Sequence, residues 1–169
     1  MQLKTWAMKI LSLTLFVMVT SCSANPKQAD IPVLEVGSQI EIQPLKDQFG
    51  KDQLLKSETV WLIFSHDMAS SKLIKAALDG KSSEDLNKQA IQYYADISGM
   101  PSLISRFIAI PRMEELGYSI ILGREEGDLA QLPRKEDMAT VIELKDGKVI
   151  SIHFHESAMT VLPIMNQPE

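Results

Sequence analysis

Three short runs of apolar residues recur along the chain and are separated by segments with helical spacing. They are 59–64 (TVWLIF), 90–95 (AIQYYA) and 118–122 (YSIIL). The first is typical of a central strand that is buried on both faces of a sheet. An earlier segment, 38–43, alternates apolar and polar residues and predicts a half-buried strand. Because strands joined through helices pair in parallel by right-handed crossovers, we expect a sheet with helices on both of its faces.

Capping and breaking residues set the expected ends of the helices between these runs. Asp67 or Ser70 can cap the start of one helix, and Gly80 fits its end. Pro101 fits the first position of a second helix, which Pro111 ends or kinks. The middle of the chain therefore alternates between strand and helix.

The last third of the chain is expected to add an antiparallel hairpin. Segments 140–144 and 149–154 are rich in β-branched residues, and Asp146-Gly147 between them is a strong turn signal. The charged segment 123–137 before the hairpin is expected to be a surface loop, and 157–165 a closing helix.

Charge and cysteine content exclude several functions. The 169 residues have a net charge of −5 and a pI of about 5.2, which argues against nucleic acid as the main partner. One cysteine cannot form an internal disulfide, a CxxC pair or a zinc–thiolate cluster. The sequence has no P-loop, and no GxGxxG follows an expected strand, so no cofactor is predicted.

The first 21 residues have the features of a secretory signal peptide. They contain no acidic residue and include an apolar stretch, 10–19, that is too short to span a membrane. Their end, Val19-Thr20-Ser21-Cys22, resembles the bacterial lipobox. The resemblance implies cleavage before Cys22, a diacylglycerol on its thiol and acylation of the new amino group. Ser23 at the next position implies transport to the periplasmic face of the outer membrane of a Gram-negative bacterium.

This interpretation divides the chain into a signal peptide (1–21), a lipidated tether (22–32) and a folded domain (33–169). The tether is polar and contains two prolines. Cleavage removes two lysines and no acidic residue, so the mature chain has a net charge of −7.

Three segments of the expected domain resemble the thioredoxin-like superfamily, in its TlpA- or peroxiredoxin-like branch. Asp47-Gln-Phe-Gly-Lys51 is similar to the turn before the central strand, and 60–72 to the strand, loop and helix start that hold CxxC. Segment 138–149 is similar to the strand and hairpin that follow the cis-proline of that family. The general pattern is also similar to the small periplasmic YtfJ family. The resemblance implies a thioredoxin-like three-layer α/β/α fold with a mixed central sheet and a C-terminal β-hairpin.

Departures from the family pattern exclude its usual chemistry. Met68-Ala-Ser-Ser71 occupies the positions of the two cysteines, and thiol–disulfide exchange needs a thiolate that serine cannot replace. Met138 or Ala139 stands where the resemblance places the cis-proline. What remains is a candidate ligand groove, whose expected residues are His66, Asp67, Met68, Ser70, Ser71, Met138 and Ala139.

Three functions stay open. We favour a redox-inactive module that is held on the membrane by its lipid and binds a periplasmic protein or peptide. A second hypothesis is an enzyme with non-cysteine chemistry, in which His66 acts as an acid or base. A third is a metal-handling protein that binds copper or zinc through His153 and His155.

Overall fold

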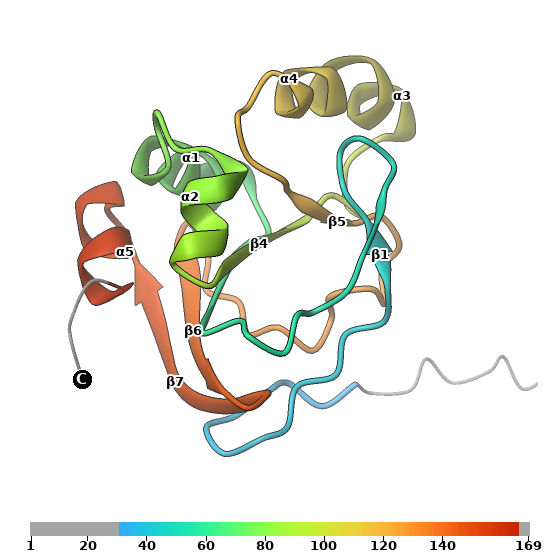
Figure 1. The fold of residues 1–169 in the computed structure, drawn as a ribbon. Coiled ribbons are helices and arrows are strands. Elements are labelled where there is room, and N and C mark those ends of the chain that lie inside the picture. Colours follow the sequence, from blue (N-terminus) through green and yellow to red (C-terminus); the bar gives the residue numbers. More distant parts are fainter. Residues whose placement is uncertain (1–30, 166–169) are drawn as a thin grey trace, which may run out of the picture. The chain divides into compact units, whose positions relative to one another are not determined.

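The computed structural model describes residues 31–165, so the predicted signal peptide, Cys22 and most of the tether lie outside the described residues. The elements are β1 (Leu45–Lys46), β2 (Asp52–Gln53), β3 (Trp61–Ser65), α1 (Met68–Ala77), α2 (Ser83–Lys88), β4 (Ile91–Asp96), α3 (Ser102–Ile104), the π-helix η1 (Ser105–Ala109), α4 (Ile110–Glu114), β5 (Ile121–Gly123), β6 (Ala139–Lys145), β7 (Lys148–His155) and α5 (Ala158–Met165). A mixed five-stranded sheet of order β5-β4-β3-β6-β7 forms the centre of the domain (Figure 1). Within 31–165, no helix has the length and apolar character that a membrane span requires.

The predicted central strand is confirmed. β3 pairs in parallel with β4, with Trp61 opposite Ile91, and antiparallel with β6. Three successive side chains of β3, Leu62, Ile63 and Phe64, are completely buried. Burial on both faces of the sheet explains why this run contains no polar alternation.

The predicted hairpin is also confirmed. β6 and β7 pair antiparallel, and Asp146 and Gly147 connect them with φ angles of 51° and 73°. A two-residue turn of this kind needs positive φ at both positions, which Asp-Gly adopts readily. α5 follows β7 as expected and packs against α1.

The two faces of the sheet are covered differently. α1, α2, α4 and α5 contribute side chains to the core on the face that carries Ile63 and Val141. Figure 1 shows α1, α2 and α5 together on one side of the sheet. The core on the other face, around Phe64, receives side chains from the N-terminal segment 34–45 and from the loop before β6. The mixed sheet is as predicted, but in the described residues the third layer is irregular chain instead of helices.

Segment 38–43 does not form the predicted strand. Gln39 alone makes a β-bridge, with Lys148, although Ile40 and Ile42 are buried at alternate positions. The backbone N–H of Ile40 donates to Gly147, in the turn of the hairpin. The segment therefore crosses the end of the hairpin and meets it only briefly, so the alternation predicts its buried side but not its pairing.

The segment predicted as the third strand pairs over less of its length than expected. Only Ile121–Gly123 pairs with β4. The backbone groups just before this segment are hydrogen-bonded to a side chain instead. The amide of Gln48 donates to the carbonyl of Tyr118 at 2.8 Å and accepts from the N–H of Ile120 at 2.7 Å. A side-chain amide thus takes the place of a neighbouring strand.

The helical region after Pro101 is longer than predicted. Pro101 precedes the first helical residue instead of occupying that position, with ψ of 133°. Pro111 does not end the helical segment, which continues through α4 because the π-helix η1 precedes α4 directly. A proline cannot donate to the carbonyl four residues earlier and its ring crowds that carbonyl, which a wider turn relieves.

The loop 123–137 is not purely a surface loop. Leu129 and Leu132 are completely buried against the second face of the sheet. Because the loop contains many charged residues, the sequence alone does not indicate that it contributes to the core.

We predict that Leu132→Ala lowers the free energy of unfolding by about 2–5 kcal/mol, because it leaves a cavity in the core. The matched control is Leu54→Ala, at a leucine that is 61% exposed, where we expect a change below about 0.5 kcal/mol. Urea denaturation monitored by tryptophan fluorescence measures both. If both substitutions lowered the free energy of unfolding equally, Leu132 would not stabilise the core on the second face of the sheet.

Candidate functional site

A cavity of about 600 Å³ opens where the carboxyl ends of β3 and β4 meet the first turns of α1. Its floor includes Tyr93 and Ala95 of β4 and Tyr118. α1 forms one wall, and the continuous helical segment α3–η1–α4 forms the other, through residues such as Ile104 and Ile108. We call this cavity the groove. It lies at the position where the sequence resemblance places the two family cysteines.

The structure brings four of the seven candidate residues together at the groove. His66, Asp67, Met68 and Ser71 line it, whereas Ser70, Met138 and Ala139 do not. Ser70 and Ala139 are completely buried, the first in the helix cap and the second in the core beneath the helices. The wall opposite α1 is therefore α3–η1–α4, and not the segment before β6 that the sequence indicated.

Asp67 fixes the start of α1. Its carboxylate accepts from the backbone N–H and the hydroxyl of Ser70, at 2.7 and 2.8 Å, and from the N–H of Asp137 at 3.0 Å. Burial raises the pKa of Asp67, but these hydrogen bonds and the nearby His66 outweigh it and hold that pKa below its ordinary value. Both predicted capping residues are thus used, in one reciprocal capping box.

His66 is held from two sides. Its Nε2 lies 3.2 Å from the carboxylate of Asp67, and its ring stacks on Phe64 with centroids 5.9 Å apart. Its Nδ1 is buried and finds no hydrogen-bond partner within residues 31–165. The hydroxyl of Ser70 donates to Asp67 and accepts from backbone N–H groups. The three residues are thus arranged as a helix cap, and not in the order nucleophile, base and acid that a catalytic triad requires.

Two tyrosines at the floor were not identified from the sequence. The hydroxyl of Tyr93 lies 2.9 Å from that of Ser65. Tyr118 is only 3% exposed, and its hydroxyl has no partner among the described residues. Burial, with smaller effects of Tyr93 and Asp79, raises the pKa of Tyr118, so its hydroxyl remains a donor at neutral pH. The sequence signal that could have indicated these residues is a tyrosine within an apolar strand, because a buried tyrosine hydroxyl usually needs a hydrogen-bond partner.

The outer wall of the groove continues into an exposed apolar surface. Leu103 and Phe107 are 71% and 65% exposed, and Ile104 and Ile108, which also line the groove, are about half exposed. The sequence predicts their helical spacing correctly, but such a stripe normally faces a core. A contiguous apolar patch on the surface of a domain marks an interaction site more often than a single exposed residue does.

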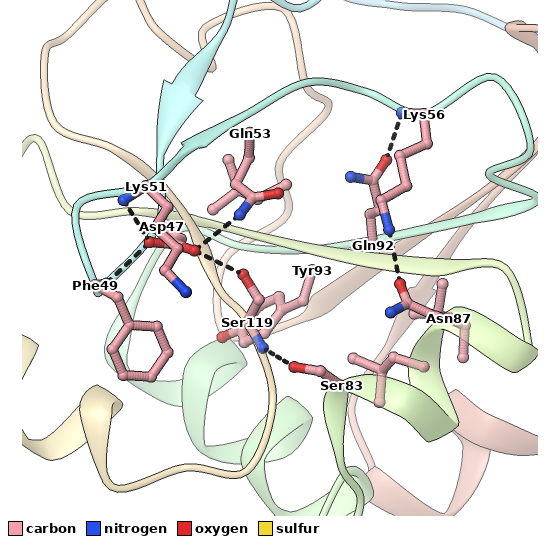
Figure 2. Close-up of a pocket in the computed structure, with 13 residues that line it drawn as sticks. Asp47, Phe49, Lys51, Gln53, Lys56, Ser83, Asn87, Gln92, Tyr93 and Ser119 are labelled. Atoms are coloured by element: carbon pink, nitrogen blue, oxygen red, sulfur yellow. Dashed lines mark hydrogen bonds between the residues drawn. The ribbon is translucent and has the colours of Figure 1, made fainter.

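A second, smaller cavity of about 280 Å³ lies beside α2 and is lined mainly by polar side chains (Figure 2). Asp47 accepts from the N–H groups of Phe49 and Lys51, from Gln53 and from Ser119. These hydrogen bonds form the turn predicted at 47–51 and join it to the segment before β5. Because the polar groups are largely bonded to one another, we assign this cavity a structural role.

The two histidines of β7 each contact a hydroxyl group. His155 contacts Thr160 through Nδ1 at 3.0 Å, and His153 contacts Ser151 through Nε2 at 3.1 Å. Their ring centroids are 6.3 Å apart. In the part of the chain that the structure describes, no group of three His, Cys, Asp or Glu side chains could hold a metal ion.

Comparisons with known proteins identify the fold. No family model and no curated protein sequence matches the chain. Among solved structures, a chain described as a thiol:disulfide interchange protein DsbE from Chlorobium tepidum is similar with a TM-score of 0.55 and 14% identity, over 78% of this chain and 95% of its own. Peroxidoxin BcpB from Mycobacterium tuberculosis gives 0.53 and 12%, over 78% and 94%. A chain described as a protein disulfide isomerase from Bacteroides thetaiotaomicron gives 0.55 and 11%, over 79% and 89%.

The domain has a thioredoxin-like fold. The identities are too low to transfer an activity, so the likeness concerns the arrangement of strands and helices. The predicted thioredoxin-like α/β class, with its mixed sheet and final hairpin, is confirmed. No cis peptide bond occurs between residues 31 and 165, Met138 and Ala139 included.

We predict that His155 makes the fold sensitive to mild acid. Burial, and to a lesser degree His153, lowers the pKa of His155 below its ordinary value. The unfolded chain therefore binds this proton more readily, so the contribution of His155 to stability is present above its unfolded pKa of about 6.5 and is lost as the pH falls below it.

His155→Gln should accordingly flatten the decline in the free energy of unfolding between about pH 7.5 and 5.5, measured by urea denaturation. His153→Gln is the control and should keep most of the decline, because burial is the larger cause. An unchanged slope in His155→Gln would contradict the prediction.

Proposed function

We propose that this protein is a lipid-anchored periplasmic module that uses a thioredoxin-like domain to bind protein segments without thiol–disulfide exchange. Exchange requires a thiolate that attacks a sulfur and a second sulfur that resolves the product. Met68 and Ser71 stand at the corresponding positions and line the groove. The single cysteine, Cys22, lies outside the domain and is assigned to the lipid.

The observation that carries the binding role is the groove together with the apolar surface that continues it. A cavity of about 600 Å³ has the size of a ligand site. The exposed side chains of Leu103 and Phe107 extend the apolar surface beyond the cavity. An occupant that covers both is larger than a small metabolite, which favours a segment of another protein.

The proposed location rests on the N-terminal sequence. Cys22 follows Val19-Thr20-Ser21 in the pattern of a lipobox, and Ser23 supports transport to the outer membrane. Several acyl chains on one cysteine give firm anchoring, since each buried methylene contributes about 0.8 kcal/mol. The polar tether would then hold the domain close to the membrane surface.

We predict that Cys22→Ser abolishes labelling of the protein by radioactive palmitate. Ser23→Asp is the matched control and should keep the label but move the protein to the inner membrane. Labelling and separation of the two membranes on a sucrose gradient measure both variants. Retained labelling of Cys22→Ser would contradict lipid anchoring at this position.

We predict that a photoreactive phenylalanine analogue placed at Phe107 cross-links to a defined protein in membranes. The same analogue at Val36, which is also exposed but belongs to the N-terminal segment, is the control. Ile104→Glu with Ile108→Glu should remove the Phe107 product, because both side chains line the groove. Cross-links that persist in the double variant, or that form equally from Val36, would contradict binding at the groove.

A further inference from the structure

Three cationic side chains at the groove have no partner within residues 31–165. Lys72 and Lys75 lie three residues apart on α1, which places them on one side of the helix. Arg112 comes from α4, on the opposite wall. All three line the groove and are exposed, and none makes an ion pair or a side-chain hydrogen bond with any residue that the structure describes.

The acidic side chains of the groove are already engaged. Asp67 is occupied by the helix cap and His66. Asp96 lies 2.7 Å from Arg134, in an ion pair whose aspartate side chain is 5% exposed. Among the residues that line the groove, the charges without an ion-pair partner in the described chain are therefore positive, although the whole chain has a net charge of −5. A local excess opposite to the overall charge is a basis for selecting anionic partners.

The interior of the groove is suited to aliphatic side chains. Ile97, Met100, Ile104, Met113 and Leu116 line it. Methionine is unbranched and flexible, so it adapts to different apolar shapes. Two buried polar atoms of the lining residues, the hydroxyl of Tyr118 and Nδ1 of His66, have no hydrogen-bond partner within residues 31–165.

The surface outside the cavity distinguishes a protein segment from a lipid tail. The exposed side chains of Leu103 and Phe107 are covered only by an occupant that extends beyond the cavity. This observation favours a protein segment over the tail of an anionic lipid.

We propose that the groove selects acidic–aliphatic protein segments. An aliphatic side chain of the segment enters between α1 and α4, and neighbouring aspartate or glutamate carboxylates meet Lys72, Lys75 and Arg112. This inference rests on the proposed function and adds the chemistry of the partner to it.

A random nonapeptide library displayed on phage and selected on the immobilised full-length protein in detergent tests this proposal. Enriched peptides should carry aliphatic residues next to Asp or Glu. The most enriched peptide and its amide counterpart, with Asn and Gln in place of the acids, are then compared by fluorescence anisotropy. The acidic peptide should bind about tenfold more tightly, as expected for a few exposed ion pairs, and added salt should reduce the difference.

Two matched sets of substitutions test which cationic side chains cause the preference for the acidic peptide. Lys72→Gln, Lys75→Gln and Arg112→Gln together should remove the preference for the acidic peptide and leave binding of the amide peptide unchanged. The control changes the same number of exposed cations elsewhere, in Lys135→Gln, Lys145→Gln and Lys148→Gln, and should keep the preference. Thermal unfolding verifies that both triple variants remain folded.

The outcomes separate this inference from the proposed function. Peptides that bind at the groove, as judged by loss of binding in Ile104→Glu with Ile108→Glu, but lack an acidic preference would overturn the inference alone. Selection that yields no groove-dependent peptide would overturn both. Displacement of the acidic peptide by dihexanoyl phosphatidylglycerol, a soluble anionic lipid, at similar concentration would identify a lipid site and overturn the protein assignment.

Discussion

The hydrogen bonds of the Asp67 carboxylate fix the position of α1, which forms one wall of the groove. The carboxylate joins three parts of the chain: His66 at the end of β3, Ser70 in the first turn of α1, and Asp137 just before β6. Because a side-chain carboxylate reaches only its immediate neighbours, these parts keep a fixed distance from one another. The start of α1, where the sequence resemblance places the family cysteines, is therefore a fixed part of the groove.

The unequal covering of the sheet determines where a ligand site can form. On the second face, Leu129 and Leu132 fill the space over Phe64 with irregular chain. On the helical face, the floor of the groove stays open at the carboxyl ends of parallel strands, which is where open α/β sheets usually bind ligands. The π-helix before Pro111 allows α3 and α4 to continue as one helical wall. A helix that ended at Pro111, one of the two outcomes that the sequence indicates, would not provide that wall.

Local signals in the sequence predict the secondary-structure elements well, but they do not predict the long-range contacts that these elements make. Capping by Asp67 and Ser70, the Asp146-Gly147 turn and the buried run 59–64 depend on neighbouring residues, and each is found in the structure. The long-range contacts were not predictable in the same way. The side chain of Gln48 makes the hydrogen bonds of a neighbouring strand at Tyr118, which is 70 residues away in the sequence. The burial of Leu132 is not evident from the sequence, because many of its neighbours are charged. The structure has a groove at His66, Asp67, Met68 and Ser71, and its opposite wall is α3–η1–α4. The sequence did not indicate that wall, because the exposed stripe on α3–η1 has the spacing of a core face.

The proposed function, binding without thiol–disulfide exchange, determines what the groove must supply. A thiol–disulfide oxidoreductase can hold its partner weakly, because a transient covalent bond between sulfurs fixes the complex while exchange proceeds. A module without thiols has only non-covalent contacts, so apolar area and charge must provide both affinity and selectivity. The exposed side chains of Leu103 and Phe107 are a liability for a solitary soluble domain. Under the proposed function, their exposure beside the groove supplies apolar area for non-covalent binding.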